Sequence, residues 1–366
     1  MEKNFSLREL NTFGFDVTAR YFQELKTLDD IQCRDATLSR LNDNPSRILI
    51  LSGGSNILFS DEFFDGFVVY PNLKGIEILE ENNETVMIRS YSGEVWKDFV
   101  DYTVSNNLYG LENLADIPGK VGAAPVQNIG AYGAEVKETV YQVHTIDLVS
   151  GETKVFSNEE CQFSYRNSIF KQFGVCSLKF EVMPMIFAVD FKLKKHGELK
   201  LDYGNIRNYL IANNITDPTL KDVAATVKAI RAEKLPEVGV VGSVGSFFQN
   251  AIVTMEKFEE IKKEYDNVPS YPVNVTDNNN EIPRCARNDR GVDAQSLIKI
   301  PTGWLIDKAG WKGYREGHVG VWDKQALVLV HYGGGKPLEI LDLMKKIQDS
   351  VKEKFGIEIK PEVNIV

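Results

Sequence analysis

The run Ile48-Leu49-Ile50-Leu51, followed at once by Ser52-Gly53-Gly54-Ser55-Asn56, decides the fold of the N-terminal part of this chain. Four apolar residues in a row predict a buried strand, and the small polar residues after them predict a loop at its end. A second strand is predicted over 67–70, and paired half-buried strands are predicted over 76–90, where apolar residues alternate with polar ones. The first 70 residues therefore indicate an α/β arrangement.

Outside this stretch, hydrophobic spacing predicts helices and further strands. Helices are predicted over 96–106, 220–232, 255–265 and 338–355, the last ended by Gly356. Strands are predicted over 143–149, 176–193 and 326–330, and a Gly/Val loop is predicted over 239–245. Within 172–191, Met183-Pro184-Met185 separates two apolar runs, which leaves an extra hairpin and a shifted strand as open alternatives. Residues 277–295 are polar and aperiodic, and we expect an inserted surface loop there.

The composition argues against several classes of protein. Of the 366 residues, 43% are hydrophobic and 26% are charged, which is ordinary for a globular protein with a sizeable core. The net charge of −10 argues against nucleic-acid binding, which needs a basic face. No apolar run approaches the ~20 residues that cross a bilayer, and the first residues lack the layout of a signal peptide. Four scattered cysteines favour free thiols, so we expect a cytoplasmic protein without membrane or nucleic-acid partners.

Residues 110–133 hold five of the 28 glycines of the chain. This density favours a loop whose backbone approaches a ligand closely, with simple turn formation as the alternative. Several common catalytic motifs are missing, since the sequence has no G-x-G-x-x-G after a strand, no H-E-x-x-H and no G-x-S-x-G. We therefore expect no metal, and an organic cofactor that supplies the chemistry.

Seven short motifs fall in order along the chain: Asn11-Thr12-Phe13-Gly14, Gly53-Gly54-Ser55-Asn56, Gly110-Leu111-Glu112-Asn113-Leu114-Ala115 with Ile117-Pro118-Gly119, Gln127-Asn128-Ile129-Gly130-Ala131-Tyr132-Gly133, Tyr165-Arg166-Asn167-Ser168-Ile169-Phe170-Lys171, Gly245-Ser246-Phe247-Phe248-Gln249-Asn250 and Pro361-Glu362-Val363. No single motif is specific, but the ordered series resembles the UDP-N-acetylenolpyruvoylglucosamine reductase family, in its longer subtype with a tyrosine lid. The resemblance runs from about residue 10 to the C-terminus.

This resemblance implies an α+β architecture: an FAD-binding fold of the vanillyl-alcohol-oxidase (PCMH) type in two subdomains, plus a third α+β substrate-binding domain. The implied boundaries are 1–70 completed by 356–366, then 71–215, then 216–355 with the polar insert at 277–295. It also implies a monomeric enzyme of peptidoglycan precursor synthesis, and hence of cell-wall formation, cell shape and cell division. NADPH would reduce FAD, which would then give a hydride to UDP-N-acetylglucosamine-enolpyruvate to form UDP-N-acetylmuramate. Because no H-x-x-C anchor accompanies the glycine-rich stretch, we expect FAD to be bound non-covalently.

The implied chemistry needs a group that binds the substrate carboxylate and one proton donor. By resemblance, Arg166 would grip the carboxylate through two parallel hydrogen bonds, and Ser246 would donate the proton. Glu362 matches the family's catalytic glutamate, and beside a developing dianion it must be protonated or share a proton network. Without the resemblance, we would interpret these residues as a surface ion-pair arginine, a turn or cap serine and a solvated glutamate.

The remaining site residues follow from the same resemblance. FAD would be held by Gly53, Gly54, Ser55, Asn56, Ile117, Pro118, Gly119, Gly122, Ala123, Gly130 and Ala131. The sugar nucleotide would be held by Tyr203, Lys234, Asn250, Lys312, Gln325 and the mobile Tyr271. Two alternatives stay open. An FAD-dependent oxidase on the same fold leaves the three catalytic matches without a role, and a non-catalytic sugar-nucleotide or flavin-binding protein is disfavoured because all three are intact.

Overall fold

The computed structural model describes residues 1–32, 47–148, 150–173, 175–177, 184–272 and 297–366. The chain forms two compact units, each assembled from separate parts of the sequence. Unit 1 comprises Met1–Leu10, Val17–Gly54 and Phe63–Glu233, and unit 2 comprises Asn11–Asp16, Ser55–Glu62 and Lys234–Val366. The expected insert at 277–295 lies outside the described residues, and the division into three domains stays a prediction.

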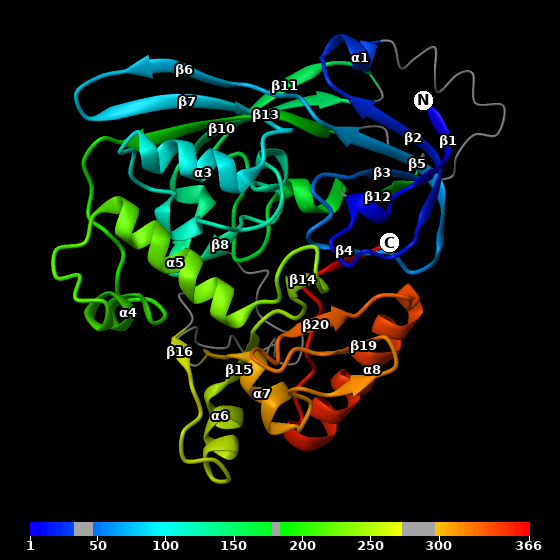
Figure 1. Ribbon diagram of the computed structural model, residues 1–366, viewed down its shortest axis with the longest axis vertical. Helices are drawn as coiled ribbons and strands as arrows, with labels where there is room; N and C mark the ends of the chain where they lie inside the picture. The colour runs from blue at the N-terminus through cyan, green and yellow to red at the C-terminus, as the bar shows by residue number, and fades with distance from the viewer. Residues whose placement is uncertain (33–46, 149, 174, 178–183, 273–296) are drawn as a thin grey trace, which may run out of the picture. The chain divides into compact units, whose positions relative to one another are not determined.

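The first sheet of unit 1 has five strands in the order β1-β2-β5-β3-β12 (Figure 1). They are β1 Glu2–Ser6, β2 Thr18–Leu25, β3 Arg47–Ile50, β5 Phe63–Pro71 and β12 Val175–Ser177. The central strand β5 is parallel to both β2 and β3, whereas β1 and β12 pair antiparallel with their neighbours. The strands predicted over 48–51 and 67–70 are confirmed as β3 and part of β5, whose continuous apolar runs suit a buried position.

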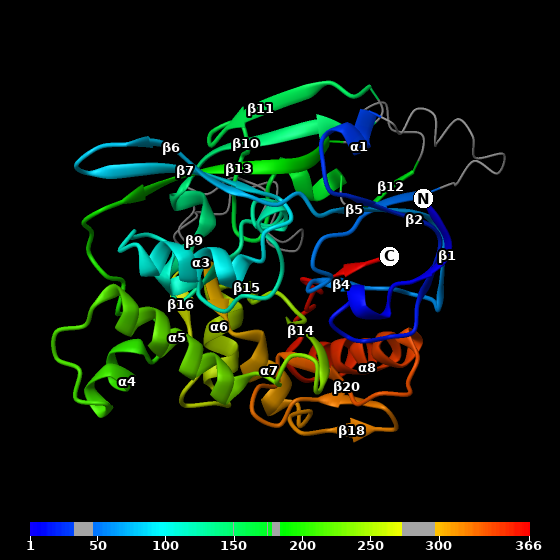
Figure 2. The same cartoon turned by 45° about the horizontal axis from the view of Figure 1, so that its top comes forward.

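The second sheet of unit 1 is antiparallel throughout, with the strand order β11-β10-β13-β7-β6. Its strands are β6 Ile76–Glu81, β7 Thr85–Tyr91, β10 Val140–Asp147, β11 Thr153–Ser157 and β13 Pro184–Lys194. The β6–β7 hairpin forms one edge of this sheet (Figure 2). Of the two apolar runs on either side of Met183-Pro184-Met185, the structure describes β12 and β13 but not residues 178–183. β12 pairs with β3, while β13 lies between β10 and β7, so these two strands belong to different sheets and do not pair with each other.

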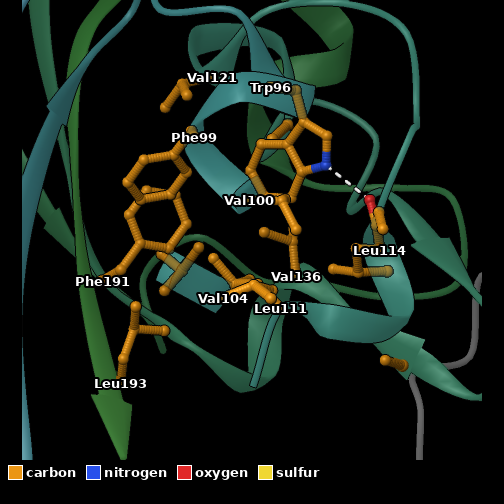
Figure 3. Close-up of a cluster of buried hydrophobic side chains, with 14 of the residues drawn as sticks. Trp96, Phe99, Val100, Val104, Leu111, Leu114, Val121, Val136, Phe191 and Leu193 are labelled. Carbon is orange, nitrogen blue, oxygen red and sulfur yellow. Dashed lines mark hydrogen bonds between the residues drawn. The ribbon is translucent and has the colours of Figure 1, made fainter. Parts of the chain in front are cut away.

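A helix packs its apolar face on this second sheet. The helix predicted from residue 96 is confirmed as α3 Trp96–Ser105, which buries side chains at helical spacing. Figure 3 shows its apolar side chains beside Phe191 and Leu193 of β13. The indole N–H of Trp96 donates to the carbonyl oxygen of Leu114 at 2.9 Å. The hydrogen bond ties α3 to the glycine-rich segment that follows it.

The remaining elements of unit 1 are short, apart from one long helix. The helices are α1 Asp29–Gln32, α4 Ile206–Ala212 and α5 Leu220–Lys234, whose last residue groups with unit 2. Single 3-10 turns occur at Arg8–Leu10, Glu112–Leu114, Val121–Ala123, Val136–Glu138 and Ile169–Phe173, and β8 Gly130–Ala131 pairs with β9 Ala134–Glu135. Buried residues of α5 join the same core as α3, so the helix predicted over 220–232 is confirmed.

Unit 2 contains a four-stranded sheet, β14-β20-β19-β18, and a three-stranded sheet, β15-β17-β16. Their strands are β14 Gly242–Ser246, β15 Ala251–Thr254, β16 Tyr271–Pro272, β17 Leu297–Ile300, β18 Arg315–Glu316, β19 Val319–Val321 and β20 Val328–His331. β4 Ile57–Leu58 pairs in parallel with β21 Asn364–Ile365. The helices are α6 Met255–Lys262, α7 Thr302–Lys308 and α8 Pro337–Phe355.

The long helix α8 packs on β19 and β20 (Figure 2). It begins with Pro337 in its first turn, where a missing N–H costs nothing, and it ends at Gly356, which has a left-handed φ of 67°. Both ends agree with the prediction. Among the described residues, no helix is both long and apolar enough to cross a membrane.

The Gly/Val segment predicted as a loop contains a strand instead, since β14 covers its second half. A Cβ atom on Gly242 would lie 2.0 Å from the carbonyl oxygen of Phe13, so this glycine permits close backbone contact rather than a turn. The amide of Ser243 donates to the carbonyl of Thr12 at 3.0 Å. The prediction was therefore wrong for residues 242–245, whereas residues 239–241 lie outside any helix or strand. Gly242 allows the Asn11–Asp16 segment to pack closely against the strand, and no local sequence pattern indicates such a contact.

Candidate functional site

Two loops of unit 1 touch backbone to backbone close to the end of β3. A Cβ atom on Gly53 would lie 2.7 Å from the Cα atom of Gly119, so the loop after β3 contacts the glycine-rich segment. A Cβ atom on Gly122 would lie 2.5 Å from the Cβ atom of Ser92. Side chains at these two positions would push the segments apart, and the packing therefore requires glycine at both.

The same loops carry groups that suit FAD. The hydroxyl oxygens of Ser52 and Ser92 are buried and have no hydrogen-bond partner among the described residues. Buried polar atoms normally have partners, so these hydroxyls fit the neighbourhood of a polar ligand. The predicted cofactor residues Gly53 and Gly54 follow Ser52, and Ile117, Pro118, Gly119, Gly122 and Ala123 form the opposing loop. Backbone amides suit the phosphates of FAD, and small residues leave room for a flat ring.

Ser55 and Asn56 continue the loop after β3 but pack within unit 2. The carbonyl oxygen of Asn56 accepts the amide of Asn364 at 3.2 Å. Its side-chain Nδ2 donates to the carbonyl oxygen of Glu362 at 3.4 Å. A residue predicted to bind the cofactor is therefore held against the backbone of a residue predicted to be catalytic.

Ser246 and Glu362 lie on adjacent segments of unit 2. The chain after β14 runs antiparallel to residues 360–362, with the Glu362 amide donating to the carbonyl of Phe247 at 2.8 Å. Phe247 and Phe248 are fully buried, whereas Ser246 is exposed. The two rings anchor the pair of segments in the core, and this leaves the serine at the surface beside the glutamate segment.

Arg166 sits in a tight turn that directs it to the glycine-rich segment. Ser164 and Asn167 exchange backbone hydrogen bonds of 3.0 and 3.1 Å, and Arg166 has a left-handed φ of 53°. Its Nη2 donates to the carbonyl oxygen of Gly130 at 2.6 Å, and a Cβ atom on Gly130 would lie 2.9 Å from its Nη1. A left-handed non-glycine residue costs roughly 1–3 kcal/mol, and such strain is often found at functional sites.

Asn128 holds this turn in place, although the sequence assigns it no role. It is fully buried, and its Nδ2 donates to the carbonyl of Ser164 at 3.0 Å and to Glu135 Oε2 at 3.1 Å. Its Oδ1 accepts the amide of Lys137 at 3.1 Å. The side-chain amide of Asn128 therefore joins two of the seven motifs, the one at 127–133 and, through Ser164, the one at 165–171. The position of Asn128 within the first of these motifs is the signal that could have indicated this role.

Tyr203 packs against the β8–β9 hairpin of unit 1. A Cβ atom on Gly133 would lie 3.0 Å from the Cβ atom of Tyr203, and Tyr203 as a whole is 49% exposed. Asn113 Nδ2 donates to the carbonyls of Tyr132 and Lys200, at 2.8 and 2.9 Å, and so clamps the two segments together. The structure thus gathers Tyr203 and the segment of Gly130 and Ala131 in one part of unit 1.

Among the predicted substrate residues of unit 2, Asn250 and Gln325 both reach the start of α7. Asn250 Oδ1 accepts the amide of Thr302 at 3.2 Å, and a Cβ atom on Gly303 would lie 3.0 Å from Gln325 Oε1. The other three predicted substrate residues lie on different elements. Lys312 is exposed in the segment after α7, Tyr271 is half exposed in β16, and Lys234 is the last residue of α5.

Two protein-family models match the chain. One, described as "UDP-N-acetylenolpyruvoylglucosamine reductase, C-terminal domain", matches residues 236–366. The other, described as "FAD binding domain", matches residues 25–157. Gly53 and Gly119, whose backbones are in contact, both lie within this range. The expected α+β architecture with an FAD-binding fold of the vanillyl-alcohol-oxidase (PCMH) type is confirmed.

Relatives match along the whole chain. The UDP-N-acetylenolpyruvoylglucosamine reductase of Flavobacterium johnsoniae is 41% identical and is aligned over 100% of this chain and 99% of its own length. The reductase of the same name from Bacteroides fragilis is 40% identical over 100% of both chains. A crystal structure of UDP-N-acetylenolpyruvylglucosamine reductase from Thermus caldophilus matches with a TM-score of 0.63 at 19% identity, over 99% of this chain and 97% of that one, which shows a shared fold.

Proposed function

The chain belongs to the UDP-N-acetylenolpyruvoylglucosamine reductase family, and we propose that it reduces UDP-N-acetylglucosamine-enolpyruvate to UDP-N-acetylmuramate. The observation that carries this proposal is the 41% identity to a reductase over the whole of this chain. The protein is an FAD-dependent oxidoreductase with NADPH as its reductant, and its product is a precursor of peptidoglycan.

FAD, when bound, supplies the hydride that is added to the vinyl carbon of the enolpyruvyl group. The addition places negative charge on the carboxylate side of the substrate, and this charge needs fixed donors. We assign that task to Arg166, whose planar guanidinium can give two parallel hydrogen bonds to a carboxylate. The 2.6 Å hydrogen bond from its Nη2 to Gly130 supports the assignment, because a guanidinium held on one side is already oriented.

We assign protonation of the adjacent carbon to Ser246. A serine hydroxyl is a weak acid, so it can serve only where a reactive carbanion is held beside it. Glu362 would be protonated or share a proton with its neighbours, because an ionised carboxylate would repel the dianion. The 2.8 Å hydrogen bond between the Glu362 amide and the Phe247 carbonyl supports a joint role, since it keeps the two segments in register.

The binding residues are proposed by their match to the family motifs. For the sugar nucleotide these are Tyr203, Lys234, Asn250, Tyr271, Lys312 and Gln325. The lysines would offer point charges to the diphosphate, and the common location of Asn250 and Gln325 at α7 supports a shared role. For FAD, bound non-covalently, they are Gly53, Gly54, Ser55, Asn56, Ile117, Pro118, Gly119, Gly122, Ala123, Gly130 and Ala131.

We further propose that the enzyme acts as a monomer in the cytoplasm, with no nucleic-acid or membrane partner. The net charge of −10 supports the lack of a nucleic-acid partner, because binding to phosphate backbones depends on clustered positive charge. The scattered cysteines support a reducing compartment.

Anaerobic NADPH consumption by the purified protein tests the function directly. We expect one NADPH to be consumed for each molecule of UDP-N-acetylglucosamine-enolpyruvate added, and almost none without it. If NADPH bleaches the flavin but the sugar nucleotide does not restore its colour, the proposed acceptor is wrong. An oxidase on the same fold would instead restore the colour with dioxygen alone.

A further inference from the structure

Lys120 lies in the middle of the predicted FAD loop, yet its side chain points into the protein. The residue is only 8% exposed, and a lysine so buried normally has strong partners. Its Nζ lies 3.8 Å from the centre of the Tyr70 ring and donates to Asn72 Oδ1 at 2.9 Å. Tyr70 is in β5 and Asn72 directly follows that strand. The side chain therefore connects the loop to the end of the central strand of the first sheet.

The partners of Lys120 are themselves held in place. Asn72 Nδ2 donates to Glu24 Oε1 at 2.6 Å, which fixes the amide so that its oxygen faces the ammonium group. Two further charges face this position, Lys74 and Glu94, whose side chains lie 3.7 Å apart. Glu24 and Glu94 favour the charged form of Lys120 and Lys74 opposes it. Burial, reinforced by Lys74, lowers the pKa of Lys120 to about 8.

The backbone around Lys120 is the backbone of the predicted FAD loop. The Gly119 carbonyl accepts the amide of Trp96 at 3.0 Å, and the Lys120 carbonyl accepts the amide of Ala123 at 3.0 Å. Gly119 also carries the backbone contact with Gly53. A shift of the Lys120 side chain would therefore move the residues that the FAD site depends on.

We propose that Lys120 is a positioning residue for FAD: its ammonium group, held between the Tyr70 ring and Asn72, anchors loop 117–123 in the conformation that receives the cofactor. The inference rests on FAD being the cofactor of the proposed function. The seven motifs do not indicate this role, because position 120 falls between two of them.

A pH dependence of FAD affinity follows from this arrangement. The charged ammonium group is attracted to the Tyr70 ring and donates to Asn72, whereas the neutral amine keeps only its hydrogen bond to Asn72 and so anchors the loop less firmly. Because the pKa of Lys120 is about 8, FAD should be held more tightly below pH 8 and released faster above it. Tyr70, Glu24, Lys74 and Glu94 are the other ionisable groups that face this position.

The test is FAD release from the holoenzyme, followed by the rise in flavin fluorescence on dilution, at pH values on both sides of 8. Lys120→Met should release FAD about tenfold more readily below pH 8 and should lose the pH dependence. Lys120→Arg, which stays charged throughout, should hold FAD tightly on both sides of pH 8. Lys74→Met removes the opposing charge and should move the wild-type transition to higher pH.

Two results for the Lys120 variants would overturn the positioning role of Lys120, and one result for the wild type would overturn the proposed function. If Lys120→Met holds FAD as tightly as the wild type with the same pH dependence, the inference is overturned. It is also overturned if Lys120→Arg binds FAD as weakly as Lys120→Met, provided that the unfolding temperature of each of these two variants equals that of the wild type. A wild-type protein that contains no FAD would overturn the proposed function itself, which distinguishes the two failures.

Discussion

The backbone amide of Glu362 donates a 2.8 Å hydrogen bond to the carbonyl of Phe247, the residue directly after Ser246. The carbonyl of Glu362 in turn accepts Asn56 Nδ2 at 3.4 Å. Three segments that are far apart in the sequence, each carrying a predicted site residue, therefore share one hydrogen-bonded arrangement within unit 2. Because the hydrogen bond between Glu362 and Phe247 joins main-chain atoms, replacing the side chain of Ser246 or Glu362 should leave the backbone of the other residue in place. The effect of each substitution can therefore be assigned to the side chain that is changed.

Ser246→Ala should lower the rate of substrate reduction by about 10²–10⁴-fold, the usual contribution of a general acid. The serine is exposed, so the substitution leaves no cavity, and FAD content and flavin reduction by NADPH should not change. Stopped-flow absorbance separates the two half-reactions. Ser243→Ala, in the same strand, is the matched control and should behave as the wild type. A near-normal rate for Ser246→Ala would show that another group donates the proton.

Arg166→Lys should reduce kcat/KM for the sugar nucleotide by about 10–100-fold. A lysine keeps the charge but cannot give two parallel hydrogen bonds, and a charge-assisted hydrogen bond contributes roughly 1.5–3 kcal/mol. FAD content should be retained. Arg207→Lys is the control, because Arg207 is an exposed arginine of the same unit that pairs with Asp202. An equal effect of the two substitutions would remove the reason for assigning Arg166 to the carboxylate.

Gly53→Ala should yield protein with little FAD. The added Cβ atom would lie 2.7 Å from the Cα atom of Gly119, and backbone atoms cannot yield without moving the loop. Gly151→Ala is the control: its φ of 76° costs strain, but nothing lies within 4 Å of the new atom. The ratio of flavin to protein absorbance measures the result. Full FAD occupancy in Gly53→Ala would mean that this contact does not shape the cofactor site.

Asp190→Asn should destabilise unit 1 at neutral pH by roughly 3–5 kcal/mol, the usual effect of breaking a buried ion pair. Asp190 is fully buried, and its carboxylate lies 2.7 Å from Arg89 Nε and 2.8 Å from both His144 Nε2 and Gln142 Nε2. Burial alone would raise the pKa of Asp190, but hydrogen bonds from Arg89, His144 and Gln142 outweigh it and hold the pKa below its usual range.

A carboxyl group whose pKa is depressed by folding stabilises the protein above its unfolded pKa of ~3.9 and loses that contribution as the pH falls below it. The gap in urea midpoint between wild type and Asp190→Asn should therefore be constant near neutrality and narrow below about pH 4. Asp202→Asn, at an exposed ion pair, should shift the midpoint little at any pH. A pH-independent gap for Asp190→Asn would contradict this account.

Several elements could be predicted from the sequence because their signals are local. The spacing of apolar residues in α3 and the glycine that ends α8 are set by residues within one or two turns of each other. The strands β3 and β5 were predictable for a similar reason, since each is a continuous apolar run. The separation of β12 and β13 into different sheets was not predictable, because an apolar run does not specify its pairing partner.

The candidate site divides in the same way. The resemblance indicated which residues to assign to catalysis, namely Arg166, Ser246 and Glu362. It did not indicate that the buried side-chain amide of Asn128 holds the turn that contains Arg166, or that the side chain of Lys120 is buried under the FAD loop. Those roles depend on which backbone atoms come within hydrogen-bond distance. Burial of each group is decided by the packing around it, and a sequence motif contains no measure of that packing.

By itself, the sequence determined the class of fold, the main helices and the family, because these depend on local periodicity and on the order of short motifs. Only the tertiary structure decided that Gly242 packs against Phe13 in a strand and that Asn56 meets Glu362 across 306 positions of the chain. Contacts at such separation form only when folding has offset the entropy of closing the intervening chain, and their geometry is set by the whole core rather than by neighbouring residues.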